Sequence, residues 1–190
     1  MTLLIAGLLL FFVPHSLSIW NESLRDRCEA KLGEMGWKGL YSIVSLAGMV
    51  LIVMGYGEAR LTAEWLYTPP AALRHVAMLL LALVFPLIVA TYFPGRIKAI
   101  VKHPMLIGTA LWGFAHLLLN GSVADVLLFG SFALWALLDL WSMNSREQRA
   151  IVTAPVFAWN DIIAIVVGLG VYGLFVVKAH VWLTGVPLVS

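Results

Sequence analysis

The sequence predicts an all-α protein, a polytopic transmembrane bundle of about six spanning helices, and its composition and length lead to this fold class. Of the 190 residues, 62% are hydrophobic and only 12% are charged, and the mean hydropathy is +0.95. Soluble domains are about half apolar and a quarter charged. A spanning helix needs about 20 mostly apolar residues, so six of them nearly fill the chain. We therefore predict one transmembrane domain over residues 1–190.

Polar stretches and prolines divide the chain into apolar segments of spanning length. The first segment lacks a basic region before it and a small-residue cleavage site after it, so we expect a retained helix rather than a signal peptide. The charged stretch Asn21–Glu34 predicts a short helix at the membrane interface. The predicted spanning segments are Thr2–Trp20, Gly39–Tyr56, Ala71–Phe93, Pro104–Leu119, Val123–Trp141 and Asp161–Leu183.

Lysine and arginine are divided unevenly between two sets of connections. Nine lie in or beside the first, third and fifth connections, whereas three lie in the second connection or near the C-terminus. Because cytoplasmic loops carry the excess of positive charge, we expect both termini to lie outside the cytoplasm. No basic run or aromatic platform indicates nucleic acid as a partner. The single cysteine, Cys28, excludes an internal disulfide and a cysteine-based metal motif.

The histidines are the candidate chemical groups, because an ionisable side chain within a membrane helix is costly and usually marks a functional position. His75 and His180 fall near the outer ends of their predicted helices and His103 near an inner end, which favours an interfacial location for all three. His15 lies about 18 Å inward from the start of its helix, and His116 about 19 Å outward from His103. In a core about 30 Å thick, His15 and His116 therefore lie near the midplane.

Two histidines at similar depth on different helices are suited to be axial ligands of one haem iron. One face of the helix that carries His116 also presents two small residues and an aromatic one, which leaves room for a flat macrocycle: Gly108, Thr109 and Trp112. Ordinary packing through small residues gives the same pattern, so the spacing leaves both interpretations open.

The remaining polar residues within or beside the helices are predicted to be structural. Asp139, near the inner end of the fifth segment, is expected to pair with Arg146 two turns later. Four further residues are predicted to act in turns and helix caps: Asn120, Asp125, Asn160 and Asp161.

Several strings resemble the NnrU family of bacterial membrane proteins, and the resemblance covers nearly the whole chain. The most specific string is HPMLIGTALWGFAH followed by NG, and others include KGLYSIVSLAGMVLIVMGYGEAR, DVLLFGSFALWALLDLWS and NDIIAIVVGLGVYGLF. The family takes its name from a gene needed for nitrite and nitric oxide reduction in denitrifying bacteria. The resemblance implies a multi-pass protein of the bacterial inner membrane, and the charge distribution then places both termini in the periplasm.

NnrU proteins are similar to the zeta-carotene isomerase of plants and cyanobacteria, a membrane haem b enzyme whose axial ligands are histidines. Its His-Pro, Trp and Ala-His pattern matches His103-Pro104, Trp112 and Ala115-His116, and its N-terminal His-Ser pair matches His15-Ser16. The resemblance thus implies that His15 and His116 ligate haem b.

This sequence departs from the isomerase at one position beside the second histidine. The isomerase has a cysteine there that is thought to exchange with the ligand histidine, whereas this chain has Gly113. Ligand switching therefore does not carry over to this chain, and the carotenoid substrate does not carry over either.

Three hypotheses for the function follow. The first is a haem b-binding membrane protein linked to nitrite and nitric oxide metabolism, as an isomerase or redox protein acting on a small or hydrophobic substrate. The second is an S-adenosylmethionine-dependent membrane methyltransferase, because KHPMLIG resembles the Arg-His-Pro-x-x-x-Gly opening of such enzymes and His103 is expected on the cytoplasmic side. The glutamate-bearing segment of those enzymes is not recognisable here. The third is a cofactor-free assembly or regulatory protein whose histidines only pack and form hydrogen bonds.

Overall fold

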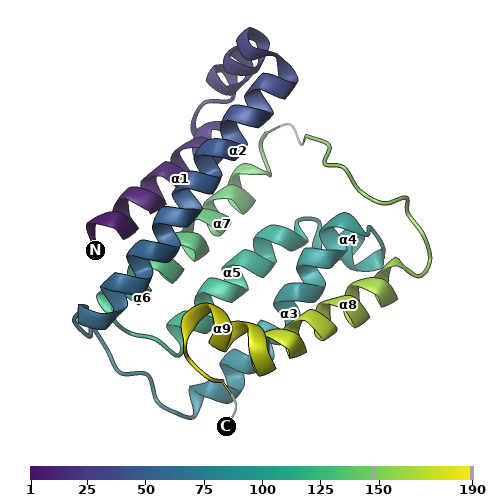
Figure 1. Ribbon diagram of the computed structural model, residues 1–190. Coiled ribbons are helices and arrows are strands. Elements are labelled where there is room, and N and C mark those ends of the chain that lie inside the picture. Colours follow the sequence, from purple (N-terminus) through teal and green to yellow (C-terminus); the bar gives the residue numbers. More distant parts are fainter. Residues whose placement is uncertain (147–148, 189–190) are drawn as a thin grey trace.

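The computed structural model describes residues 1–146 and 149–188, and the regular elements of this part of the chain are helices (Figure 1). The elements are α1 (Thr2–Trp20), α2 (Glu22–Thr62), α3 (Leu73–Tyr92), α4 (Arg96–Val101), α5 (Pro104–Leu117), α6 (Val123–Asp125), η1 (Val126–Gly130), α7 (Ser131–Ser142), α8 (Asn160–Leu174), η2 (Phe175–Ala179) and α9 (His180–Thr184). The short π-helical turns η1 and η2 make continuous helices of α6–α7 and of α8–α9.

The predicted fold class is confirmed, but helix lengths differ: the predicted segment Gly39–Tyr56 lies within α2, which continues to Thr62. In the described residues, five continuous helices are long and apolar enough to cross a membrane: Thr2–Trp20, Glu22–Thr62, Leu73–Tyr92, Val123–Ser142 and Asn160–Thr184. The predicted fourth segment is the 14-residue α5, which ends at Leu117 because the residues after it form a turn. At 1.5 Å per residue α5 is about 21 Å long, which is shorter than a typical bilayer core.

The helices pack side by side in an order that differs from their order in the chain. The pairs in contact are α2 with α1, α1 with α7, α7 with α5, α5 with α3, and α3 with α8 (Figure 1). The short helix α5 is thus flanked by α7 and α3, and six of its residues are buried. Protein rather than lipid covers much of its surface, which allows a helix of this length within the bundle.

A glycine breaks α2 into a short charged helix and a long spanning helix. Gly33 has φ 73° and ψ 160°, a backbone conformation that side-chain-bearing residues rarely adopt. Asn21 begins the charged part, and its side-chain oxygen accepts a hydrogen bond from the Leu24 amide at 2.9 Å. The predicted short helix over Asn21–Glu34 is therefore present, and it ends at the break.

Small residues bring α1 and α2 into backbone contact. A Cβ atom placed on Gly48 would lie 2.8 Å from the Phe11 nitrogen, and one on Gly7 would lie 2.6 Å from the Ile52 nitrogen. Close approach of this kind is the usual basis of helix association in membranes, where lipid tails are as apolar as the helices themselves.

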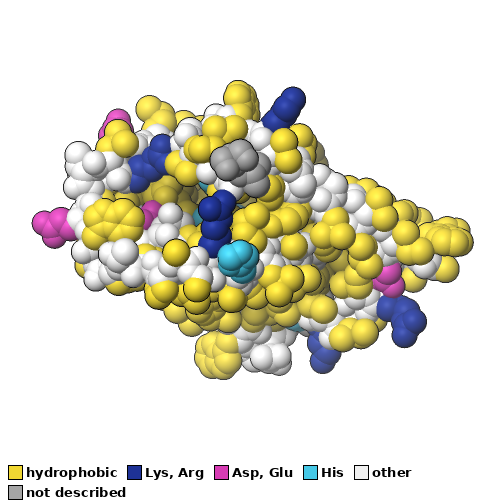
Figure 2. Space-filling model, turned by 90° about the horizontal axis from the view of Figure 1, so that it is seen from below, with side chains coloured by type: hydrophobic (Ala, Val, Ile, Leu, Met, Phe, Trp, Pro, Cys, Tyr) yellow, Lys and Arg dark blue, Asp and Glu magenta, His cyan; other side chains and the backbone are white. Residues whose placement is uncertain are grey.

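The outer surface of the bundle is apolar. Figure 2 shows hydrophobic side chains over much of one end view, with the charged side chains scattered among them. Large side chains such as Ile43, Leu79 and Val166 are 69%, 69% and 64% exposed. Apolar surface of this extent is unfavourable in water and favourable in lipid.

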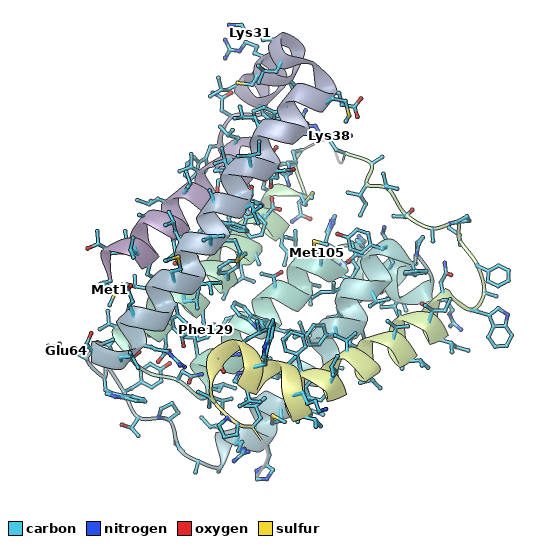
Figure 3. All side chains as sticks on the ribbon, in the orientation of Figure 1. Met1, Lys31, Lys38, Glu64, Met105 and Phe129 are labelled. Carbon is cyan, nitrogen blue, oxygen red and sulfur yellow. The ribbon has the colours of Figure 1, made fainter. Side chains whose placement is uncertain are left out.

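The two sets of connections lie at opposite ends of the bundle. In Figure 3, Met1 and Glu64 lie at one end of the α1–α2 pair, and Lys31 and Lys38 lie at the other.

We predict that alkaline phosphatase fused to the C-terminus is active, because this enzyme folds only in the periplasm and the lysine-rich end is expected in the cytoplasm. The same reporter inserted after Arg96 should be inactive. A C-terminal fusion that is inactive although it is expressed would contradict the orientation.

Candidate functional site

His15 lies in α1 at the junction with α2 and α7, in an aromatic environment. Its Nδ1 atom is 2.6 Å from the carbonyl oxygen of Phe11, one turn earlier. Because a carbonyl only accepts, Nδ1 carries the proton and Nε2 keeps its lone pair. The Phe11 ring stacks on the imidazole with centroids 4.1 Å apart, and the rings of Tyr41 and Trp135 lie at 4.8 Å and 5.8 Å.

His116, near the end of α5, has the same arrangement. Its Nδ1 is 2.8 Å from the carbonyl oxygen of Trp112, again one turn earlier, so that Nε2 is again the atom with the lone pair. The ring of Phe129 stacks on the imidazole with centroids 4.4 Å apart. Asn120 does not hold the imidazole; its side-chain amide donates to the His116 carbonyl at 2.9 Å and fixes the backbone.

A chain of aromatic rings connects the two imidazoles. Phe11 stacks on His15 and contacts Phe132 at 5.4 Å, Phe132 contacts Trp112 at 5.5 Å, and Trp112 contacts His116 at 4.9 Å. In the part of the chain that the structure describes, the two histidines make no ring contact with each other. The structure thus places both predicted ligands on one aromatic cluster without bringing them together.

The other residues predicted beside His116 face different neighbours. Trp112 lies on the α7 side and packs on Phe129 as well as on His116. Gly108 faces α3, where an added Cβ would lie 3.3 Å from the Val84 carbonyl oxygen. The space that the sequence predicts for a macrocycle beside Gly108 is therefore filled by α3.

Gly113 lies at a close contact between α5 and the helix that begins at Val123. A Cβ atom there would lie 2.6 Å from the carbonyl oxygen of Phe129 and 2.9 Å from the Cβ of Ala133. A cysteine such as the isomerase has at this position would push the two helices apart. Phe129 belongs to the π-helical turn η1, and such turns are frequent at functional sites.

The three histidines predicted to be interfacial lie at helix ends. His103 immediately precedes α5, at the opposite end of this helix from His116. His75 is exposed in the first turn of α3. His180 begins α9, and its Nδ1 is 2.9 Å from the carbonyl oxygen of Val186.

The predicted cap and ion-pair residues act as expected. Ser122 and Asp125 form a capping box at the start of α6. The buried Asp125 carboxylate also accepts a hydrogen bond from the Tyr56 hydroxyl at 2.7 Å. Arg146 donates to Asp139 at 2.6 Å.

The pair Asn160–Asp161 connects α8 to the start of α4. Asp161 accepts hydrogen bonds from the backbone amides of Arg96 and Ile97, at 2.9 Å and 3.0 Å. Asn160 donates to the carbonyl oxygens of Pro94 and Pro155.

A cavity of about 410 Å³ lies beside His15 at the lysine- and arginine-rich end of the bundle. Its lining comes from α1, α2 and the segment after α7: Pro14, His15, Ser18, Arg25, Trp37, Lys38, Tyr41, Ser42, Met143, Arg146, Arg149 and Ile151. His116 does not line it. In the sequence, these cations indicate only the orientation in the membrane, because Arg146 and Arg149 lie more than 100 positions after Arg25 and Lys38.

A family model described as NnrU protein matches residues 3–188, which is nearly the whole chain. No curated protein matches the sequence. No solved structure matches it either. A family match of this extent, together with the helical bundle described above, places the chain in a family: the protein is a member of the NnrU family.

Proposed function

We propose that the protein binds haem b in the bacterial inner membrane, with His15 and His116 as the ligating side chains, and that it supports nitrite and nitric oxide metabolism. The matched environment of the two imidazoles is the observation that carries this proposal. Each Nδ1 is held by the carbonyl oxygen one turn earlier, and each ring stacks on a phenylalanine. Histidines that bind metals usually have the other ring nitrogen fixed in this way. The family membership supports the link to nitrogen oxides.

The distribution of possible ligands favours a haem over a bare metal ion. Among residues 1–146 and 149–188, no group of three or more His, Cys, Asp or Glu side chains is placed to hold an ion. A porphyrin supplies four nitrogen ligands itself, so that its iron needs only one or two histidines from the protein.

The aromatic cluster supplies the apolar surroundings that a macrocycle needs. Phe11, Phe132, Trp112 and Phe129 pack between the two histidines, so a haem held by both imidazoles would exchange ring–ring contacts for ring–porphyrin contacts. When bound, the iron would supply redox or Lewis-acid chemistry for a small or hydrophobic substrate. The surrounding phenylalanines would exclude water from that substrate.

A network of polar side chains lies at the start of the continuous helix that carries Phe129. The Tyr56 hydroxyl donates to the buried Asp125 carboxylate, which accepts two further hydrogen bonds from Ser122. The network satisfies the buried carboxylate, and its Tyr56 ring contacts Phe129 at 5.8 Å.

The absorption spectrum of protein purified from haem-sufficient cells tests the proposal. The parent should show a Soret band, and both His15→Ala and His116→Ala should lower the haem content and shift that band. His75→Ala is the control and should leave the spectrum unchanged, because His75 is exposed in the first turn of α3.

Two results would overturn the ligand assignment. One is a colourless parent protein, which would favour the cofactor-free assembly or regulatory protein. The other is an unchanged spectrum in both histidine variants. Saturable binding of S-adenosylmethionine by a colourless parent would favour the methyltransferase instead.

A further inference from the structure

The cavity beside His15 combines a cationic rim with an apolar floor. Among the described residues, four that line the cavity are cations and none is an acid: Arg25, Lys38, Arg146 and Arg149. Trp37, Tyr41, Met143 and Ile151 supply apolar and aromatic surface. Its volume of about 410 Å³ falls within the range of small-molecule sites.

The carboxylates that pair with these cations lie outside the cavity lining. Arg25 bonds Asp26 and Glu29, and Arg149 bonds Glu22 and Asp26. Among the described residues, the charged side chains that line the cavity are therefore all positive, which favours an anion within it.

Several donors of these cations remain available. In the described residues, Arg25 uses only its Nη1 in these bonds, and Arg146 uses only its Nη2, on Asp139. A guanidinium carries five N–H donors, so both side chains keep donors for a ligand. Lys38 donates to Glu34 at 2.6 Å, a bond that holds the pKa of the Glu34 carboxyl below its usual value and leaves further ammonium hydrogens.

The position of the cavity favours a ligand with an apolar tail over a soluble anion. It lies where the spanning parts of α1 and α2 meet the charged connections, and the side chains next to it on these helices face outward: Val13, Trp20 and Ile43 are 49%, 71% and 69% exposed. Basic pockets between helices on the cytoplasmic side of a membrane bind the head groups of anionic lipids.

We propose that this cavity binds the head group of a phospholipid with net negative charge, with Arg25 and Lys38 contacting the phosphate and the acyl chains lying along α1 and α2. His15 also lines the cavity, but the head-group contacts proposed here come from the cations of the rim and not from the imidazole.

Lipid retained by the purified full-length protein, measured by native mass spectrometry, tests this site. Phosphatidylglycerol should be retained, and phosphatidylcholine with the same acyl chains should bind at least about 10-fold more weakly. The double variant Arg25→Gln/Lys38→Gln should weaken phosphatidylglycerol binding by about 10-fold or more, since each basic residue near an anionic head group contributes on the order of 1 kcal/mol.

The matched control removes the same charge from the same helix. Arg27 and Lys31 do not line the cavity, so Arg27→Gln/Lys31→Gln should keep phosphatidylglycerol binding within about twofold. Ser42→Trp retains all four cations and fills the cavity, and it should also lose the lipid. Ser42→Trp therefore tests the site even if the variant Arg25→Gln/Lys38→Gln disturbs the charged helix by removing the Arg25 ion pairs.

Three outcomes would overturn the proposal. The haem content of the same samples is measured as well, so that failure of the lipid site can be told apart from failure of the haem assignment. Equal retention of both lipids would remove the charge selectivity. Displacement of phosphatidylglycerol by an equal concentration of glycerol 3-phosphate would assign the cavity to a soluble anion. Loss of the lipid whenever haem is bound, with retention in haem-free protein, would assign the cavity to the haem carboxylates.

Discussion

Replacing Asp139 by alanine should destabilise the protein by about 3–5 kcal/mol, the largest effect that we expect from one substitution. The carboxylate accepts a hydrogen bond from Arg146 at 2.6 Å, and the two side chains are only 9% and 13% exposed. Removing the acid leaves the guanidinium in a largely buried position without its partner. Unfolding of the purified protein in mixed micelles with increasing SDS, followed by circular dichroism, measures the loss.

The exposed pair of Lys38 and Glu34 provides the control for this prediction. Its side chains are 62% and 68% exposed, so water and salt screen the pair. Glu34→Ala should therefore leave the unfolding midpoint unchanged. The double variant Asp139→Leu/Arg146→Met should recover much of the stability lost in Asp139→Ala, because removing both charges of a buried pair costs less than removing one. If Asp139→Ala is as stable as the parent, the pair is not buried as described.

Replacing Gly113 by cysteine should produce the second large effect, a destabilisation of about 1–3 kcal/mol with loss of bound haem. An added Cβ would lie 2.6 Å from the backbone carbonyl oxygen of Phe129, so α5 and the turn that carries Phe129 must separate. Phe129 stacks on His116, and its displacement would disturb the proposed ligand. SDS titration measures the stability, and the Soret absorbance per protein measures the haem.

Gly57→Cys is the control for this substitution, because no atom lies within 4 Å of a Cβ placed there. It should leave stability and haem content unchanged. A Gly113→Cys protein with parental stability and a new thiolate-type spectrum would contradict the packing and would show that a cysteine can reach the iron in this fold.

The helical bundle is predictable from the sequence because it depends on local properties. The length and hydropathy of each segment decide whether it can cross a membrane, and five predicted segments correspond to long apolar helices. The pairing of Asp139 with Arg146 is also predictable, since the two residues lie two turns apart. The length of α5 is not, because burial between α7 and α3 allows a helix of 14 residues.

The candidate site is predictable only in part. A carbonyl one turn earlier is available to every helical histidine, so the Nδ1 hydrogen bond of each imidazole follows from the helix that carries it. Which side chains lie between the two histidines depends on how α1, α5 and α7 are rotated about their axes. Contacts between distant segments fix that rotation, and the apolar pattern of a membrane helix specifies it only weakly.

Composition and hydropathy alone predict a helical membrane protein and the places of its helices along the chain. Only the tertiary structure decided that Gly108 faces α3, that Gly113 leaves no space for a side chain, and that cations from separate segments line one cavity. The physical reason is that hydropathy acts on each segment independently, whereas close packing and charge clustering depend on which segments become neighbours.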